Sequence, residues 1–532
     1  MIMQAIGLSP EEGKAIARYL SGKEFGSAES PVTGLCPVGS KVFRPDSAGW
    51  NGWGVDTSNT RFQPEPGLTA DQVSKLKLKW AFGFPDTIMA YAQPTISGGR
   101  VFVGSGSGQV YSLDAATGCT YWIYDAGIGV RSAITIASLP GGRWAAFFGD
   151  INANVHAVDA STGKRLWKVR VDDHPVARVT GAPVFYDGRV YAPVSSIEEA
   201  SAMSPAYECC KFRGSLVALE AATGKQIWKS YSVTDPPRPT RRTKDGVQLY
   251  GPAGAAIWGA PTIDAKRKLI YAATGNSYTG VDINTSNAVL AIDLESGRLK
   301  WARQVLPKDN FVMGCRPGKE VCPPELGPDL DFGSSTILTT IAGGKQILLA
   351  GQKSSTLYGL DPDQQGKILW QNKLGKGGAL GGIEWGFAAD SSTAYVAVSD
   401  RFGRETSGGL HAVRIESGEK LWSNIPAKPD CEPRVKGCSP AKSAAISAMP
   451  GVVFSGSVDG HFRAYSAKTG EIIWDFNTAQ KFSTVNGIEA SGGSLDSGGP
   501  AIANGMVFTG SGYGLWNGIP GNVLLAFSVD GK

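Results

Sequence analysis

Several side chains that could bind a ligand or move a proton stand at the ends of apolar runs in the second half of the chain. Trp258 comes just before one such run, and Asn276 comes just after the next. Asp331 precedes the run that begins at Ser335, and Trp385 follows a Gly-rich turn. Because an antiparallel hairpin returns to the end at which it began, we expect these side chains at one mouth of the fold. Carboxylate and amide oxygens suit Ca²⁺ better than Zn²⁺.

A lysine lies among apolar residues in the stretch LLAGQKSSTLYGLD, which we interpret as a strand. A lone cation such as Lys353 is costly there unless it meets an anion or another acceptor. Alone, Trp258 would more often be ordinary core packing. A planar anionic ligand that rests on an aromatic plate would account for Lys353 and Trp258 together.

Two of the eight cysteines, Cys209 and Cys210, are adjacent. A free pair is the simplest interpretation of such neighbours. In an oxidised protein they can instead close a small rigid ring, and we expect a ring of that kind to lie at a site.

Four other cysteines form two close pairs, Cys315/Cys322 and Cys431/Cys438, each enclosing six residues of a Pro- and Gly-rich loop. This spacing predicts local disulfides, and the absence of a nearby histidine or second pair argues against zinc. Disulfides indicate an oxidising compartment.

The first ten residues lack the basic start and long apolar core of a secretion signal, so we expect an exported chain to be a processed form or to begin internally.

Composition restricts the class of partner. The 532 residues carry a net charge of +5, with 19% charged and 42% hydrophobic residues, as in soluble globular proteins. The densest basic stretch, Arg238–Lys244, is better explained as a solvated loop than as a nucleic-acid patch. No stretch approaches 18 apolar residues, so we expect no membrane span.

The elements that must position these side chains come from a repeat. The stretch VALEAATGKQIW joins a short apolar alternation, a Thr-Gly turn and a Trp, as a tight hairpin would. Copies span residues 111–122, 156–167, 217–228, 290–301, 358–370, 411–422 and 463–474. A hairpin of this size cannot bury its own apolar face, so copies spaced roughly 40–70 residues apart predict stacked four-stranded blades.

An eighth copy is divided between the chain ends. Leu524–Lys532 stops before its Trp, whereas Leu76–Phe84 contains a Trp with no copy before it. Joining the two closes a ring and leaves no long sheet edge unpaired. We therefore predict an all-β fold, an eight-bladed β-propeller over residues 68–532 with one blade shared between the chain ends. Long spacings between copies predict inserted loops, and a site, at about 195–213, 232–262, 274–288 and 305–335.

The first residues differ from the repeat. Residues 1–26 predict one short helix, with Ser9 as N-cap, Pro10 at the first helical position and Gly22 as C-cap. This helix resembles the last helix of a cytochrome c domain, although an N-terminal cap helix explains it equally well. The haem-attachment motif C-x-x-C-H is absent, so we expect no covalent haem in this chain. Residues 27–67 predict an irregular connecting segment.

The motifs CC, W-G-x-P, T-G-N, D-F-G and Q-K-S occur in that order, and in this the chain resembles the pyrroloquinoline quinone (PQQ)-dependent alcohol dehydrogenases. The resemblance covers about residues 36–532 and is strongest to members that act on polyvinyl alcohol. It implies oxidation of secondary alcohol groups to ketones with PQQ and Ca²⁺, electron transfer to a cytochrome c, and a periplasmic or secreted location. The same repeat occurs in a non-catalytic scaffold of outer-membrane assembly, and a PQQ dehydrogenase for small alcohols or sugars is a further alternative.

The resemblance also implies a role for each candidate residue. Asp331 would be the general base and a neighbour of the metal, and Asn276 would be a metal ligand. The remaining cofactor contacts it implies are Trp258 as the floor, a Cys209–Cys210 disulfide opposite that floor, Lys353 near the reactive carbonyl, Trp385 at the border and Arg131 at a carboxylate.

The third metal ligand has three candidates. The family pattern S-S-x-x-E matches Ser195, Ser196 and Glu199, which favours Glu199. Glu208, beside the cysteine pair, is the rival, and Glu198 is the third candidate. Lanthanide-dependent relatives carry a further Asp two residues after the base, where this chain has Gly333, so the resemblance favours Ca²⁺.

Overall fold

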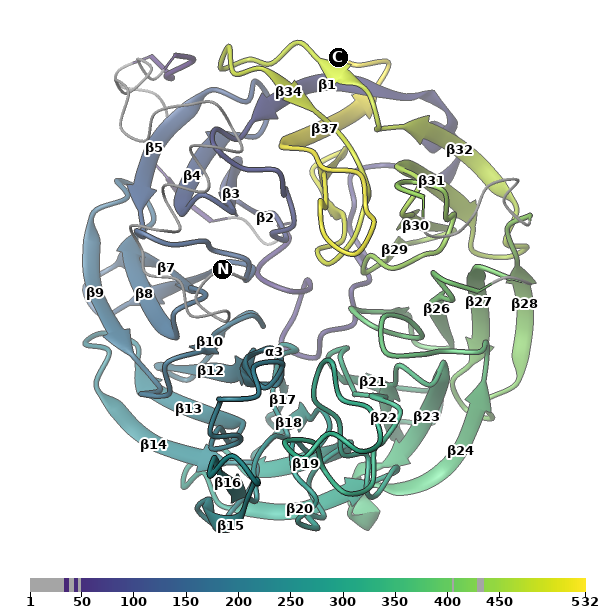
Figure 1. The fold of residues 1–532 in the computed structure, drawn as a ribbon. Helices are drawn as coiled ribbons and strands as arrows, with labels where there is room; N and C mark the ends of the chain where they lie inside the picture. The colour runs from purple at the N-terminus through teal and green to yellow at the C-terminus, as the bar shows by residue number, and fades with distance from the viewer. Residues whose placement is uncertain (1–32, 38–42, 46–48, 404–405, 428–434) are drawn as a thin grey trace.

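The computed structural model describes residues 33–37, 43–45, 49–403, 406–427 and 435–532. Eight antiparallel sheets stand around one axis like the blades of a propeller (Figure 1). The predicted all-β, eight-bladed fold is therefore confirmed. The predicted N-terminal helix lies outside the described residues. None of the helices in the described part of the chain has the length and apolar character that a membrane span requires.

The first four blades in chain order run from the innermost to the outermost strand. The first comprises β2 (Thr95–Ser97), β3 (Arg100–Gly104), β4 (Gln109–Asp114) and β5 (Thr120–Asp125), and the second β6 (Thr135–Leu139), β7 (Arg143–Gly149), β8 (Asn154–Asp159) and β9 (Arg165–Arg170). The third comprises β11 (Val184–Tyr186), β12 (Arg189–Ser196), β13 (Ser215–Glu220) and β14 (Gln226–Tyr231), and the short strand β10 (Ala177–Arg178) also pairs with β12. The fourth comprises β17 (Thr262–Asp264), β18 (Leu269–Ala273), β19 (Ala288–Asp293) and β20 (Leu299–Gln304).

The next three blades follow the same order. They comprise β21 (Ile337–Thr340), β22 (Gln346–Gly351), β23 (Thr356–Asp361) and β24 (Lys367–Lys373); β25 (Ala388–Ala389), β26 (Thr393–Ser399), β27 (Gly408–Arg414) and β28 (Lys420–Asn424); and β29 (Ser447–Met449), β30 (Val452–Gly456), β31 (His461–Ser466) and β32 (Ile472–Asn477).

The last blade joins the two ends of the propeller. Its order is β35 (Ala501–Ala503), β36 (Met506–Ser511), β37 (Val523–Val529) and β1 (Leu76–Gly83). Strand β1 pairs antiparallel with β37 along its whole length. Ring closure by the chain ends is thus confirmed. The first and last parts of the propeller share one blade, so the ring has no gap between them.

The repeated Trp explains how each blade locks onto the next. Seven of the eight outer-strand tryptophans donate their indole N–H to a main-chain oxygen of the following blade, as Trp122 does to Ala160 at 3.0 Å. The indole lies over the turn glycine of that blade, where a Cβ on Gly297 would be 2.6 Å from Trp228 Cδ2. Trp474 closes the ring, because it donates to the Leu76 oxygen at 2.9 Å.

Residues 49–63, which precede the first strand, cross the centre of the ring (Figure 1). Residues 49–63 form main-chain hydrogen bonds with the first strands of five blades, β2, β17, β21, β25 and β29. Arg61 is fully buried there, stacked on Trp50 and Trp53, and burial lowers its pKa to about 9. Its guanidinium donates to Trp53 O, Ile446 O, Gln93 Oε1 and Ser447 Oγ, so the charge is spread over oxygens from three parts of the chain.

The remaining elements belong to connections. They are the short helices η1 (Ala70–Lys75), α3 (Glu198–Ser201) and η2 (Pro362–Gln364), and the hairpins β15 (Arg238–Arg242)/β16 (Gln248–Gly251) and β33 (Lys481–Phe482)/β34 (Ala490–Ser491). Helix α3 and the hairpin β15–β16 arise from the long insertions that the uneven repeat spacing predicted.

Candidate active site

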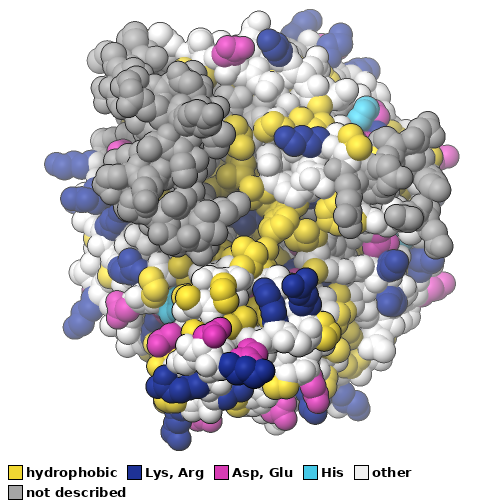
Figure 2. All heavy atoms as spheres, viewed as in Figure 1, with side chains coloured by type: hydrophobic (Ala, Val, Ile, Leu, Met, Phe, Trp, Pro, Cys, Tyr) yellow, Lys and Arg dark blue, Asp and Glu magenta, His cyan; other side chains and the backbone are white. Residues whose placement is uncertain are grey.

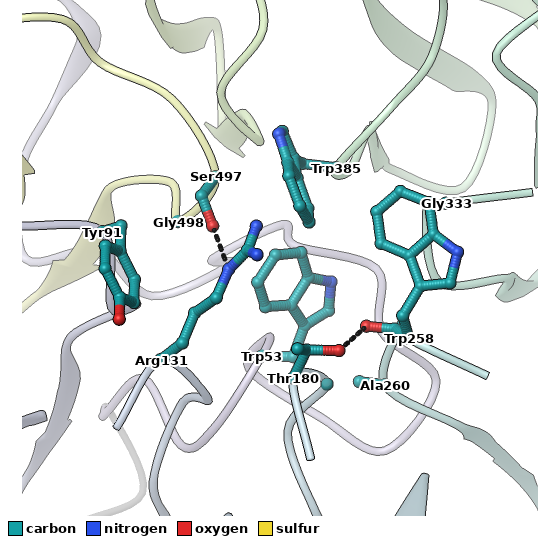
Figure 3. Close-up of a pocket in the computed structure, with 12 residues that line it drawn as sticks. Trp53, Tyr91, Arg131, Thr180, Trp258, Ala260, Gly333, Trp385, Ser497 and Gly498 are labelled. Carbon is teal, nitrogen blue, oxygen red and sulfur yellow. Dashed lines mark hydrogen bonds between the residues drawn. The ribbon is translucent and has the colours of Figure 1, made fainter. Parts of the chain in front are cut away.

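A narrow pocket lies where the first strands of the blades begin (Figure 3). Its lining residues are Trp53, Tyr91, Arg131, Thr180, Gly181, Trp258, Gly259, Ala260, Gly333, Trp385, Ser497 and Gly498. All but Trp53 stand a few residues before, or lead into, the first strand of a blade. Figure 2 shows hydrophobic side chains gathered at the centre of the molecular face that is turned to the viewer.

Two tryptophans predicted for the site meet in this pocket. Trp258 and Trp385 pack edge to face, with ring centroids 5.0 Å apart and planes at 81°. The indole of Trp385 donates to Asp496 Oδ1 at 2.7 Å, and Asp496 is in turn paired with the buried Arg401 at 2.8 Å. The Asp496–Arg401 ion pair therefore fixes the orientation of one wall of the pocket.

A guanidinium group also lines the pocket, that of Arg131. Arg131 lies with its Cζ 4.0 Å from the Trp385 ring centroid and donates from Nε to Ser497 Oγ at 3.0 Å (Figure 3). Within the described residues, Arg131 Nη2 and Arg178 Nε are buried donors without a hydrogen-bond partner. Burial, reinforced by the nearby charge of Arg131, lowers the pKa of Arg178 to about 10. Two buried and unsatisfied guanidinium donors are the chemistry that an anionic, carboxylate-bearing ligand would complete.

The predicted base and the predicted cation are in direct contact. Lys353 Nζ lies 3.0 Å from Asp331 Oδ2, 3.4 Å from Asp329 Oδ1 and 5.4 Å from the Trp258 ring centroid. Burial alone would lower the pKa of Lys353, but the two carboxylates raise it above its ordinary value. Burial also raises the pKa of Asp329. The lysine thus places one positive charge between two buried carboxyl groups beside the aromatic floor.

Lys353 does not lie in a strand, contrary to the expectation from sequence. Strand β22 ends at Gly351, and Lys353 lies in the turn that leads to β23. Its main-chain N–H donates to the Asp331 oxygen at 2.9 Å instead of to a neighbouring strand. This bond joins the turn to the loop that carries the predicted base. The strand after that loop, β21, begins at Ile337 rather than at Ser335, where the sequence analysis placed its start.

The predicted metal ligands interact with one another through a hydrogen bond and through their charges. Asn276 donates its main-chain N–H to Asp331 Oδ1 at 2.6 Å, and its amide hydrogens go to the oxygens of Ser277 and Phe311 at 2.8 Å. The amide oxygen of Asn276 is thereby the atom left for a ligand. Burial, together with the charge of Asp331, raises the pKa of Glu199 to about 7. A divalent cation between Glu199 and Asp331 would relieve this repulsion.

In the described part of the chain, no three His, Cys, Asp or Glu side chains form a cluster able to hold a metal ion. A cation would therefore need the amide oxygen of Asn276 beside the carboxylates. Such an all-oxygen set suits Ca²⁺, so the residues present fit the ion.

The two rival glutamates have other surroundings. Glu198 is fully buried and accepts hydrogen bonds from the N–H groups of Lys211 and Phe212, both at 2.8 Å, and from the Tyr207 hydroxyl at 3.0 Å. Glu208 is exposed and paired with Lys211 at 3.0 Å. Glu198 thus anchors the cysteine loop, and Glu208 points to solvent.

The structure joins Cys209 to Cys210. Both are buried, in the same hydrophobic cluster against which Trp258 packs. The predicted Cys315–Cys322 disulfide is present, and Cys36 pairs with Cys119, a bond the sequence did not predict. Cys431 lies outside the described residues, so the Cys431–Cys438 disulfide stays a prediction.

Gly333 is required by close packing rather than by its backbone angles. A Cβ at this position would lie 2.3 Å from Trp258 Cη2 and 2.4 Å from the Glu384 oxygen. No residue with a side chain fits here unless the floor moves. The Trp258 ring therefore occupies the space that the side chain of an Asp at position 333 would need.

Several pocket residues were missed by the sequence analysis. Trp53 comes from an irregular segment, and Tyr91, Thr180 and Ser497 belong to no motif. Their shared signal is position, a few residues before a first strand, where Trp258 and Trp385 also stand. The described Trp53 Nε1 is likewise a buried donor without a partner.

Two curated proteins align with the whole of this chain. A polyvinylalcohol dehydrogenase from Pseudomonas sp. is 45% identical, with 87% of its own length covered. A second, from Sphingopyxis sp. (strain 113P3), is 44% identical, with 86% covered. This chain belongs to the PQQ-dependent alcohol dehydrogenase family. Residues 50–313 also match the family described as the glucose/ethanol/alcohol dehydrogenase β-propeller domain.

Solved structures agree on the fold of the PQQ-dependent dehydrogenase. A quinohemoprotein alcohol dehydrogenase from Comamonas testosteroni superposes with a TM-score of 0.64 at 19% identity, covering 91% of this chain and 81% of that one. A europium-containing methanol dehydrogenase gives 0.64 at 17% identity, covering 91% and 98%. Residues 352–487 and 406–531 match the family of the outer membrane protein assembly factor BamB, which shares the repeat.

Proposed function

We propose that this oxidoreductase converts secondary alcohol groups, those of polyvinyl alcohol or a related polymer, to ketones with bound PQQ and Ca²⁺. The observation that carries the proposal is that an unsatisfied guanidinium donor of Arg131, two tryptophans packed edge to face and a lysine-paired carboxylate lie close together. The full-length similarity to two polyvinylalcohol dehydrogenases supports the choice of substrate.

The protein residues have separate tasks in this proposal. Trp258 is the floor for a planar ligand, Trp385 borders it and Arg131 with Arg178 pairs its carboxylates. The Cys209–Cys210 disulfide, in the cluster against which Trp258 packs, would contact the ligand opposite that floor. When bound, PQQ supplies a two-electron acceptor and Ca²⁺ a Lewis acid.

Asp331 accepts the proton of the substrate hydroxyl. Lys353 holds that carboxylate beside the Trp258 floor through an ion pair, with Nζ 3.0 Å from Asp331 Oδ2. Glu199, Asn276 and Asp331 provide the metal oxygens. The surroundings of Glu198 and Glu208 support Glu199 as the third ligand. Gly333 leaves no room for a further acidic ligand, which supports Ca²⁺ over a lanthanide.

Electrons then leave for a cytochrome c, and we propose a periplasmic or secreted location. The disulfides of the described residues support an oxidising compartment. A non-catalytic scaffold would have no use for the Lys353–Asp331 pair beside two tryptophans.

A substrate panel tests the function. The full chain is loaded with PQQ and Ca²⁺, and reduction of an artificial dye is followed with polyvinyl alcohol, small secondary alcohols, primary alcohols and aldoses. The proposal predicts the highest kcat/KM with the polymer and ketone as product. Faster turnover of primary alcohols or aldoses would reassign the substrate, and no PQQ-dependent turnover with any of them would reject the enzyme.

A further inference from the structure

A second cavity, here called the outer groove, lies outside the pocket described above. It has a volume of about 480 Å³, within the range of small-molecule binding sites. Its walls come from residues 233–235, 252, 281–285, 304, 307 and 308. None of these residues lines the inner pocket.

Each wall belongs to a connection that also carries a predicted site residue. The connection from β14 to β17 holds Thr234 at its start and Trp258 at its end. The loop from β18 to β19 holds Asn276 and then Asn284, and the connection from β20 to β21 holds Lys308 and then Asp331. The same three connections therefore carry both predicted site residues and the walls of the outer groove.

The walls are fixed to the inner site by hydrogen bonds. Gln304 donates from Nε2 to the oxygens of Ile283 at 2.8 Å and Ser286 at 3.0 Å. The buried Asp309, next to Lys308, accepts the N–H groups of Asp329 at 2.9 Å and Leu330 at 2.8 Å. The groove is thus braced against the loop that carries the proposed base.

The lining suits a chain in which methylene groups alternate with hydroxyl groups. Five of the twelve lining residues are aliphatic or proline, and seven carry hydroxyl, amide, carboxylate or ammonium groups. Val281 and Ile283 alternate with the exposed Asp282 and Asn284 on one wall. None of the twelve is aromatic, so no ring plate is offered to a sugar or an aromatic alcohol.

We propose that the outer groove is a binding subsite for a distant segment of an aliphatic polyol chain, one of whose hydroxyl groups reacts at Asp331. This inference rests on the proposed function, because it deepens the choice of a polymeric substrate. A subsite of this kind lowers KM for the polymer and leaves the chemistry of the bound hydroxyl unchanged.

Filling the groove tests the subsite. Thr234→Trp and Asn284→Trp each place a bulky ring at an exposed position of the wall, and Thr340→Trp is the matched control. Thr340 is exposed at the far end of β21, the strand that begins beyond Gly333. Steady-state kinetics of the PQQ-loaded full chain are compared for long polyvinyl alcohol and for a small secondary alcohol.

We expect both groove variants to raise KM for the polymer about 10-fold at unchanged kcat, which marks a loss of uniform binding. Both parameters for the small alcohol should stay within about twofold of wild type, as should all parameters of the control. Calorimetric titration of polyvinyl alcohol into the PQQ-free chain should show the same loss of affinity in the groove variants.

The outcomes separate the two proposals. If wild type oxidises the polymer and the groove variants match the control, the subsite is overturned and the proposed function stands. If wild type binds the polymer through the groove but oxidises only small alcohols, the subsite stands and the polymer is not the reacting substrate. A wild type that oxidises small alcohols and neither binds nor oxidises the polymer overturns both.

Discussion

Replacing the proposed base by its amide is the sharpest perturbation of the catalytic assignment. In Asp331→Asn the side-chain oxygen can still accept the Asn276 N–H, which lies at 2.6 Å, so the loop keeps one of its two bonds. The other bond, to Lys353, loses its charge, but Lys353 retains Asp329 at 3.4 Å. The lysine is therefore never left without a counter-ion, and folding should survive.

The two possible roles of Asp331 differ widely in magnitude. Loss of one charge-assisted hydrogen bond costs about 1–3 kcal/mol of the free energy of unfolding. Loss of a general base lowers the rate by about 10²–10⁴. We therefore expect a folded Asp331→Asn protein that retains PQQ and barely turns over.

Asp329→Asn is the matched control, because it removes the other carboxylate on Lys353 and leaves the Asp331 contacts in place. Its turnover should fall by no more than about tenfold. Thermal unfolding, PQQ content and dye-linked turnover are measured for both variants. Near-normal turnover of Asp331→Asn together with an inactive Asp329→Asn would show that the base is assigned two residues too late.

Three further predictions concern other residues. Gly333→Ala should weaken PQQ binding by at least about 10-fold in an equilibrium titration, because its Cβ would lie 2.3 Å from Trp258 Cη2; unchanged affinity would contradict this packing. Burial raises the pKa of Glu384 from 4.5 to about 7, so its stabilising effect is complete below pH 4.5 and lost as the pH rises through 7. Denaturant titrations of Glu384→Gln should accordingly show a pH-dependent loss smaller by roughly 1–3 kcal/mol, and an unchanged pH profile would refute it. The denatured, unreduced protein should show no free thiol at Cys209 or Cys210 and no haem Soret band; two thiols in that peptide, or a covalent haem, would count against these two assignments.

The propeller could be predicted because its specification is local and repeated. Each copy has a turn glycine a few residues before its Trp, and the Trp of one copy packs on the turn glycine of the next, as Trp228 does on Gly297. The split repeat likewise required the closure between β1 and β37. At the entrances of first strands, Trp258 and Trp385 were named from the sequence, whereas Tyr91, Thr180 and Ser497 belong to no motif and were missed.

Other parts of the site depend on contacts that no local pattern records. Trp53 reaches the pocket because residues 49–63 exchange hydrogen bonds with blades distant in sequence. Side chains of neighbouring helical residues differ in direction by about 100°. Glu198 therefore accepts a hydrogen bond from the cysteine loop, whereas Glu199 is close enough to Asp331 for that charge to raise its pKa. The family pattern favoured Glu199 over Glu208 and Glu198, but sequence alone could not show which way each side chain turns.

Binding of PQQ to the full chain tests the central claim most directly. Titration in the presence of Ca²⁺ should show one saturable site per chain, and Arg131→Met should weaken it by at least about 10-fold, because it removes a buried donor that has no partner within the described protein. Arg242→Met, on the exposed strand β15, should bind as wild type does. The absence of saturable binding, or equal affinity in Arg131→Met and wild type, would contradict the assignment of this mouth as the cofactor site.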